Sequence, residues 1–441
     1  MVMAAMVLAF RARALAFVAG GLAMVAWLAP TPLAMLPVPV MALAGCAMAK
    51  LVAARPLLLA PAIAALVGFF LLVREVLPAM GVLPPIGLGG SIGLSYVMFR
   101  LIQLLVDGAE GEGPAEAPLS SLMAWLLFPP SLLAGPIGRA QDFLEDLAAP
   151  AAWPSGEDWM RHGAGVAGGL FGLVVLAAAP WWVFQQAMMR LDGGALVLAG
   201  AALGFALWLW LSFAGYSRLA VSLAGLMGVR LPANFDRPWA AETMLAVWSR
   251  WHISLSDWFR LYVFNPLLKW LLGVTGATKQ AHWLGAVAYC GTFLLMGLWH
   301  GIGLRLALYG LLLGAAAGVN KVAQTLLARR LGKPGYAALK RRRGYALASS
   351  VGAVGTFVMA LAFLWLPGEA VTPGLFVTIP LTALIVCAVL APLLPAGARL
   401  ADHAAPVLAA RRGWVAALQL AALIGALWLG LQPPPLLYQF F

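Results

Sequence analysis

Ionisable and hydroxyl side chains interrupt an otherwise apolar sequence in two places. The first is Trp248–Leu261, WSRWHISLSDWFRL, which holds His252 among arginines, serines and one aspartate. The second is Met296–Gly301, MGLWHG, which places His300 in an apolar run. A neutral imidazole can accept the proton of an attacking hydroxyl near neutral pH, and polar groups held at membrane depth are usually functional because they are costly there. We therefore expect His300, with His252 nearby, to act in proton transfer.

A helix over Trp248–Leu261 would have one apolar face and two faces suited to a polar cavity. The apolar face consists of Trp251, Leu255 and Trp258. The other two faces consist of Arg250, Ser254 and Asp257, and of His252, Ser256 and Phe259. An interfacial amphipathic helix, with tryptophans at the lipid headgroups, fits the same pattern.

The glycine after His300 adds no side-chain bulk, so a ligand or another chain can approach the imidazole. A structural histidine that bonds to a neighbouring helix is the alternative interpretation. His252 and His300 lack the H-E-x-x-H spacing of a zinc site, so we expect no metal. No nucleophile elbow, P-loop or dinucleotide-binding fingerprint occurs in a suitable context.

Composition fixes the environment of these residues. Of 441 residues, 63% are hydrophobic and only 10% are charged, whereas a soluble domain needs about a quarter charged residues. Barrel strands would alternate polar and apolar residues, so the long apolar runs predict helices. We expect an all-α, polytopic integral membrane protein with about eleven spans, and residues 1–441 as a single unit. The three cysteines form no metal pattern, and their odd number argues against a full disulfide framework.

The expected spans are Ala14–Ala29, Pro32–Ala49, Pro56–Val73, Ser91–Val106, Gly163–Val183, Gly194–Phe213, Trp283–His300, Gly303–Val319, Tyr345–Leu366, Pro373–Leu394 and Trp414–Leu431. The net charge of +12 comes from basic residues in the short joints between them. This predicts cytoplasmic loops, not nucleic-acid binding. The joint Arg329–Arg343 carries seven basic residues and is predicted to be cytoplasmic, which places His300 near the outer end of its span.

Two regions are predicted to be neither plain spans nor plain loops. Asp107–Asp158 holds nine of the sixteen acidic residues and contains Phe128–Pro136, whose three prolines and one glycine prevent a regular spanning helix. Irregular backbone at membrane depth needs protein or a water-filled cavity to satisfy its polar groups. The second region, Pro232–Gln280, carries the first histidine motif.

The stretch RWHISLSDWFR followed by GLWHG resembles the membrane-bound O-acyltransferase family. Its bacterial branch contains the alginate O-acetylation subunit and the D-alanylation subunit for teichoic acid. Further segments are similar to the family in the same order: Gly93–Phe99, Phe128–Pro130, Ala134–Ile137, Phe213–Ser217 and Pro232–Pro238. Together they cover roughly residues 91–320.

The resemblance implies that His300 occupies the family's catalytic histidine position, and that His252 occupies a second polar position of the bacterial branch. Around them we expect residues that bind substrate or line a tunnel. These are Trp299, Gly301, Arg250, Trp251, Ser254, Ser256, Asp257, Tyr216 and Asn234.

The sequence departs from the family at several positions. Ser212, just before the Phe213–Ser217 segment, stands where many bacterial relatives have aspartate. Arg218, just after that segment, stands where relatives often have an acidic residue. Leu261–Pro266 lacks the glycine-rich continuation of alginate-type members, and Met296 is more similar to the D-alanylation type. These differences leave the substrate open but do not touch either histidine.

The resemblance further implies transfer of a short acyl group, acetyl or D-alanyl, from a cytoplasmic thioester. The donor would be acyl-CoA or an acyl-carrier protein, with no permanently bound cofactor. The acceptor would be a hydroxyl of an extracytoplasmic polysaccharide or cell-envelope polymer, reached directly or through a partner acyltransferase. Membrane lipids would surround the protein in the bacterial cytoplasmic membrane. A transporter or flippase, or a non-catalytic scaffold subunit of a polymer-secretion complex, remains the alternative.

Overall fold

The computed structural model describes residues 2–82, 93–150, 153–190, 194–277, 280–366, 375–431 and 434–435, and nearly all of them are helical. Within these ranges, strand pairing is limited to one isolated bridge between Phe235 and Trp251. A helix satisfies its own backbone polar groups, which is why long apolar runs adopt it in lipid. The all-α prediction is confirmed.

Seven of the described helices are long and apolar enough to cross a membrane. They are Leu33–Ala54, Pro56–Ala79, Gly156–Met188, Gly194–Leu226, Ala281–Trp299, Leu304–Arg341 and Arg343–Leu364. Shorter apolar helices cover Ala12–Leu28, Leu381–Gly397 and Arg412–Trp428. The protein is therefore a polytopic helical membrane protein. Each of the eleven ranges expected from the sequence holds helix, although residues 91–92 and 373–374 of two ranges lie outside the described residues.

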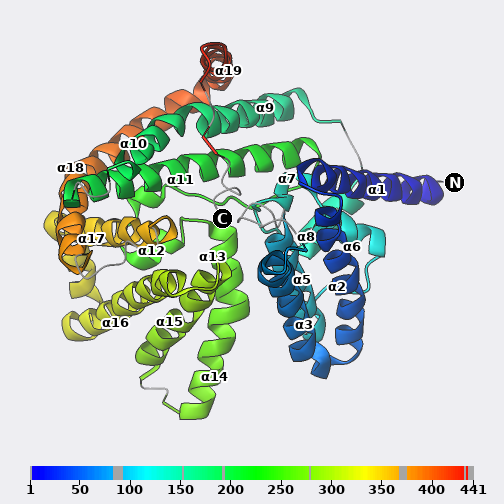
Figure 1. The fold of residues 1–441 in the computed structure, drawn as a ribbon, viewed down its shortest axis with the longest axis horizontal. Coiled ribbons are helices and arrows are strands. Elements are labelled where there is room, and N and C mark those ends of the chain that lie inside the picture. Colours follow the sequence, from blue (N-terminus) through cyan, green and yellow to red (C-terminus); the bar gives the residue numbers. More distant parts are fainter. Residues whose placement is uncertain are drawn as a thin grey trace.

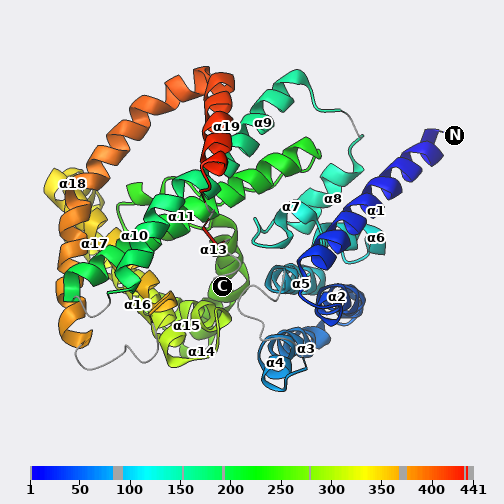
Figure 2. The same cartoon turned by 45° about the horizontal axis from the view of Figure 1, so that its top comes forward.

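Two groups of helices lie on either side of a central pair of helices (Figures 1 and 2). One group contains α1 (Val2–Leu28), α2 (Pro37–Ala54), α3 (Leu59–Leu71), α5 (Leu94–Ala109) and α6 (Leu119–Leu126). The other contains α15 (Ala281–Trp299), α16 (Leu304–Arg341), α17 (Arg343–Leu361) and α18 (Leu375–Ala410). Between them lie α13 (Ile253–Phe259) and α14 (Asn265–Thr275). Both histidine motifs lie where these groups meet.

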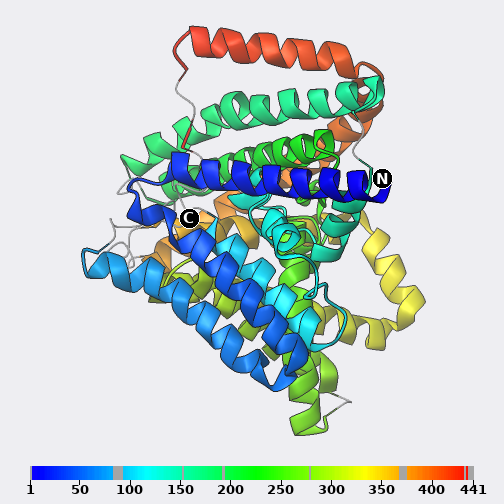
Figure 3. The same ribbon diagram turned by 90° about the vertical axis from the view of Figure 1, so that its right-hand side faces the viewer.

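Three further helices lie one above another along one side of the molecule (Figure 3). They are α19 (Arg412–Trp428), α9 (Gly156–Phe171) and α11 (Gly194–Leu226), with α10 (Ala178–Met188) continuing beside α11.

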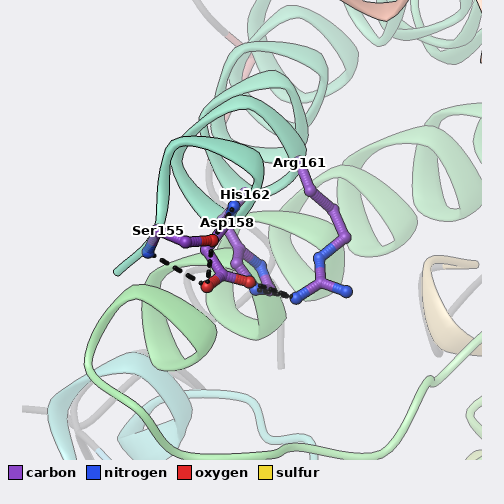
Figure 4. Close-up of polar contacts among 4 residues, drawn as sticks. All are labelled: Ser155, Asp158, Arg161 and His162. Carbon is purple, nitrogen blue, oxygen red and sulfur yellow. Dashed lines mark hydrogen bonds and ion pairs between the residues drawn. The ribbon is translucent and has the colours of Figure 1, made fainter. Parts of the chain in front are cut away.

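Helix α9 begins seven residues before the expected span at Gly163 because a capping box starts it (Figure 4). Ser155 Oγ accepts from the Asp158 backbone N–H at 3.1 Å, and the Ser155 N–H donates to Asp158 Oδ2 at 3.1 Å. Arg161 holds the other carboxylate oxygen at 2.6 Å, next to His162.

Arg100 on α5 explains how the proline-rich segment survives inside the protein. Its guanidinium is fully buried and donates to the carbonyls of Trp125, Leu126 and Ser131 at 2.8, 2.9 and 3.0 Å. It also reaches Ser131 Oγ at 2.6 Å. The Trp125 and Leu126 carbonyls lie at the end of α6, and Ser131 lies in the short helix α7 (Pro129–Leu132). The prediction that Phe128–Pro136 is not a regular spanning helix is confirmed, and its freed backbone groups are satisfied by protein.

The prediction of one helix over Trp248–Leu261 is wrong. Helix α12 (Met244–Trp248) ends there, and α13 begins only at Ile253. Between them His252 adopts a left-handed conformation with φ 44° and ψ 54°. The bridge from Trp251 to Phe235 pulls this turn against the 232–238 loop, so tertiary pairing overrides the helical pattern. Arg250 and Ser254 consequently do not share a helical face.

Within the residues that the structure describes, three segments are wound as π-helix: Leu72–Val76, Gly172–Leu176 and Arg260–Phe264. Such turns often occur at functional sites because the extra residue redirects side chains. The first holds Arg74, which contacts the second histidine motif, and the third directly follows α13.

Candidate active site

His300 lies in a tight turn between α15 and α16. Its N–H bonds to the Gly297 carbonyl at 3.1 Å, and the Gly301 N–H bonds to the Leu298 carbonyl at 3.1 Å. Gly301 has φ +153°, a conformation that side-chain-bearing residues rarely adopt. The glycine in the motif is therefore needed for the turn itself, besides leaving space near the imidazole.

Aromatic side chains surround the imidazole of His300, which is half-buried. The Trp299 ring lies 4.5 Å away between centroids, and the ring of Tyr309 on α16 lies 5.7 Å away. Arg74 donates to the backbone carbonyls of Trp299, at 2.5 Å, and of His300. The turn is thus held from the side by a distant part of the chain.

His252 is buried, with 6% of its surface exposed. Its Nε2 lies 3.1 Å from the hydroxyl of Tyr96 on α5, and its ring meets Phe213 on α11 edge to face at 4.6 Å. Nδ1 has no partner from another residue in the described part of the chain. Because Nε2 is engaged and the buried Nδ1 has no such partner, this histidine can relay or orient a proton.

Phe99 connects the surroundings of the two histidines. Its ring lies 6.3 Å from that of Tyr96, which contacts His252, and 5.2 Å from that of Trp299, which contacts His300. Helices α5, α11, α13, α15 and α16 therefore converge on one region, as Figure 2 shows near the centre of the molecule.

Asn234 and Ser254, both predicted as site residues, contact each other, and Ser254 lies two residues after His252. Ser254 Oγ donates to Asn234 Oδ1 at 2.6 Å, and the Ser254 N–H donates to the same oxygen at 3.2 Å. Asn234 Nδ2 donates to Ser217 Oγ on α11 at 3.2 Å, and Ser254 Oγ accepts from the Ile137 N–H at 3.0 Å. This network fixes the start of α13 and hence the backbone next to His252.

Other predicted site residues occupy different surroundings. Trp251 is buried against Phe235 and Phe357, at 5.1 and 4.9 Å between ring centroids. Ser256 Oγ donates to the Trp251 carbonyl at 3.1 Å. The Arg250 carbonyl accepts from the Asp236 N–H at 3.0 Å.

Tyr216 and Asp257 each make a contact away from the histidines. Tyr216 donates to the Pro130 carbonyl at 3.2 Å and accepts from the Ala134 N–H at 3.4 Å, so it supports the proline-rich segment. Asp257 is exposed and pairs with Arg260 at 2.8 Å.

Two cavities flank α13. The larger, about 540 Å³, is strongly charged and is lined in part by Arg139, Asp142, Glu145, Arg230, Asp257 and Arg260. The smaller, about 270 Å³, is mainly apolar and is lined in part by Trp248, Phe259, Phe264, Tyr289, Phe293 and Met296. Ile253, Asp257 and Arg260 line both. A charged and an apolar cavity thus adjoin one short helix, next to the turn that holds His252.

An ion pair fixes one wall of the larger cavity. Arg230 Nε bonds to Asp146 Oδ1 at 2.7 Å, and the Arg230 N–H bonds to Oδ2 of the same carboxylate at 2.7 Å. This contact raises the pKa of Arg230, which stays positively charged. Arg13 donates to the Asp146 carbonyl at 3.0 Å and ties α1 to the same place.

Three residues at the site were missed in the sequence: Arg74, Tyr96 and Phe99. Tyr96 and Phe99 belong to the Gly93–Phe99 segment, which is similar to the family but whose sequence indicates no role for either ring. Arg74 is an arginine directly after an expected apolar span, and a charge in that setting is itself a signal of function. In the described residues, no three His, Cys, Asp or Glu side chains gather in a way that could hold a metal ion.

The fold and site define a multi-pass helical membrane protein with one buried and one half-buried histidine. Residues 115–329, which contain both, match the model of the membrane-bound O-acyltransferase family. The chain is 31% identical over 232 residues to the teichoic acid D-alanyltransferase of Bacillus subtilis, covering 52% of this chain and 58% of that protein. It is also 31% identical over 246 residues to the probable alginate O-acetylase AlgI of Pseudomonas aeruginosa, covering 53% and 44%. The chain thus matches about half the length of these relatives.

Proposed function

We propose that the protein is a membrane O-acyltransferase that uses His300 as its general base. The observation that carries the proposal is the His300 turn: a half-buried imidazole, beside a second histidine, inside the region that matches the family. The named relatives transfer D-alanyl or acetyl groups. We propose one of these two short groups for this protein, with residues 1–441 acting as a single unit.

In the proposed reaction, a hydroxyl oxygen of the acceptor attacks the carbonyl carbon of a thioester. His300 takes the hydroxyl proton as the new C–O bond forms. The C–S bond then breaks, and the proton passes from His300 to the departing thiolate, which leaves as a thiol. A positioned general base contributes about 10²–10⁴ in rate.

His252 is proposed to orient the reactants. Its buried, unpaired Nδ1 or the Tyr96 hydroxyl is proposed to donate to the oxygen that becomes negative in the tetrahedral intermediate, and stabilising that charge contributes strongly to acyl transfer. The aromatic rings around both histidines exclude water and so limit hydrolysis of the thioester.

We propose that the donor, acyl-CoA or an acyl-carrier protein, approaches from the cytoplasmic side of a bacterial inner membrane. We further propose that Arg139, Arg230 and Arg260, which line the charged cavity beside α13, bind the phosphates of either donor, with Arg230 and Arg260 exchanging their ion pairs with Asp146 and Asp257 for the phosphates. The acceptor is then an envelope polymer or partner protein on the outer side.

The test uses purified full-length protein in detergent. Release of free thiol from acetyl-CoA, and separately from a D-alanyl carrier protein, is measured with a hydroxyl acceptor. We expect His300→Ala to lower the rate by about 10²–10⁴, while the protein elutes and melts like the wild type. His403→Ala, a change of an exposed histidine on α18, is the matched control and should keep full activity.

Wild-type activity in His300→Ala would rule out the base role. A wild-type protein that leaves both thioesters intact would instead favour a transporter or scaffold subunit.

A further inference from the structure

We infer that Arg74 is a positioning residue that holds the His300 turn in its reactive geometry. The inference rests on the proposed role of His300 as a general base. It concerns a residue outside both histidine motifs and outside the matched region 115–329.

The contacts of Arg74 are made with one short piece of backbone. Nη1 donates to the Trp299 carbonyl at 2.5 Å, and Nη2 donates to the His300 carbonyl. Nη2 also lies 3.7 Å from where a Cβ on Gly301 would be. Arg74 Nε faces the carboxylate of Glu75 at 3.4 Å, and the Arg74 side chain is only 9% exposed.

The chemistry of a helix end explains why an arginine is suited to this place. The last carbonyls of α15 have no partner within their own helix, and they carry the negative end of its dipole. Two donors in a rigid fork can bind two successive carbonyls at once, whereas lysine offers a single point charge. Arg74 therefore satisfies the end of α15 and fixes the direction in which His300 leaves it.

The backbone around Arg74 is arranged for this contact. Arg74 lies in the π-turn Leu72–Val76, which follows α3 and redirects its side chain. Its guanidinium also lies 5.6 Å from the centre of the Phe70 ring, so the cation is held between an aromatic face and the two carbonyls. Because its terminal nitrogens are occupied by backbone, Arg74 acts through His300 and not on substrate.

The test compares Arg74→Met and Arg74→Lys with wild type and with Arg13→Met. Arg13 is the matched control because it also donates to carbonyls near a helix end, those of Met227 at 2.6 Å and Gly228 at 3.0 Å, away from the histidines. Each full-length protein is measured for kcat and KM with acetyl-CoA and with a D-alanyl carrier protein. Two readouts do not need activity: amide hydrogen exchange over residues 297–306, and the rate at which diethyl pyrocarbonate modifies His300.

We expect Arg74→Met to speed exchange in residues 297–306 only and to change the modification rate of His300. With whichever donor the wild type uses, kcat should fall by about 10²-fold, because misplacement of a catalytic group by about 1 Å costs that much. KM should stay within about twofold, and Arg74→Lys should recover part of kcat, since one carbonyl contact can re-form. Arg13→Met should leave the exchange of residues 297–306 and the modification rate of His300 unchanged.

Unchanged exchange at the turn, or wild-type kcat, in Arg74→Met would overturn the inference. So would faster exchange across the whole protein in both arginine variants, which would mean a general structural role. If wild type cleaves neither thioester, the proposed function fails, and the exchange and modification data alone decide whether Arg74 holds the turn.

Discussion

Asn234 joins three separated parts of the chain through one side-chain amide. Its oxygen accepts from the backbone and hydroxyl of Ser254, and its nitrogen donates to Ser217. All three side chains are buried. Because the neighbouring groups cannot reach water, replacing Asn234 leaves them without partners.

We expect Asn234→Ala to lower the free energy of unfolding by about 1–3 kcal/mol, the usual cost of leaving a buried polar group unsatisfied. Thermal unfolding in detergent would show a lower midpoint than wild type. Asn265→Ala, at an exposed position on α14, is the matched control and should change the midpoint little. Equal midpoints for the two variants would mean that the Asn234 network carries no net stability.

Sequence motifs predicted which residues cluster near the histidines better than they predicted what those residues contact. Asn234 and Ser254 do meet, and His252 lies close to His300. The roles of Arg74 and Tyr96 were not predicted, because each contact joins residues more than 150 positions apart and depends on how α3 and α5 pack. Local spacing carries no information about such contacts.

At the scale of elements, α15 and α16 pack through glycines. A Cβ on Gly310 would lie 2.2 Å from the Phe293 carbonyl oxygen, and one on Gly314 would lie 2.7 Å from the Cys290 Cα. Small residues let two helix backbones approach this closely inside a membrane. The turn with His300 connects these two helices, so their separation sets its shape.

We expect Gly310→Ala to push α16 away from α15, with a loss of stability of about 1–3 kcal/mol from overpacking and a fall in acyl transfer. Gly352→Ala on α17 is the control, since a Cβ there would meet nothing within 4 Å. The two variants would be compared by thermal unfolding and by thiol release from the donor. Wild-type behaviour of Gly310→Ala would show that the helices can separate without moving the turn.

Apolar periodicity and length were enough to place helices, because a run that is apolar on most sides has few alternatives in lipid. They failed at Trp248–Leu261. The side chains there follow helical spacing, but the Phe235–Trp251 bridge and the left-handed conformation of His252 interrupt the expected helix. Helix α5 shows a related limit. Its buried Arg100 and Gln103 make it a core helix inside the bundle, a role that its sequence alone did not distinguish from a span.

For the whole molecule, the basic residues predict one orientation. The α16–α17 joint near Arg341–Arg343 should lie in the cytoplasm, and the His300 turn at the other end of α16 should face outward. Ala338 and Ile302, one near each end, are both exposed.

We expect an impermeant thiol reagent on whole cells to label Ile302→Cys, and to label Ala338→Cys only after permeabilisation. Both changes would be made in a protein whose Cys46, Cys290 and Cys387 are replaced by serine, and that protein without a new cysteine is the control. The reverse pattern would place the His300 turn on the cytoplasmic side, within direct reach of the proposed donor, and require another route for the acceptor.

Ile253 and the Asp257–Arg260 pair line both the charged cavity and the apolar one. A molecule that displaces those side chains from one cavity must change the volume and charge of the other. Occupancy of the two cavities is then thermodynamically linked, and by reciprocity each occupant alters the affinity of the other by the same factor. A shared lining of this kind makes two ligands cooperative or competitive without direct contact between them.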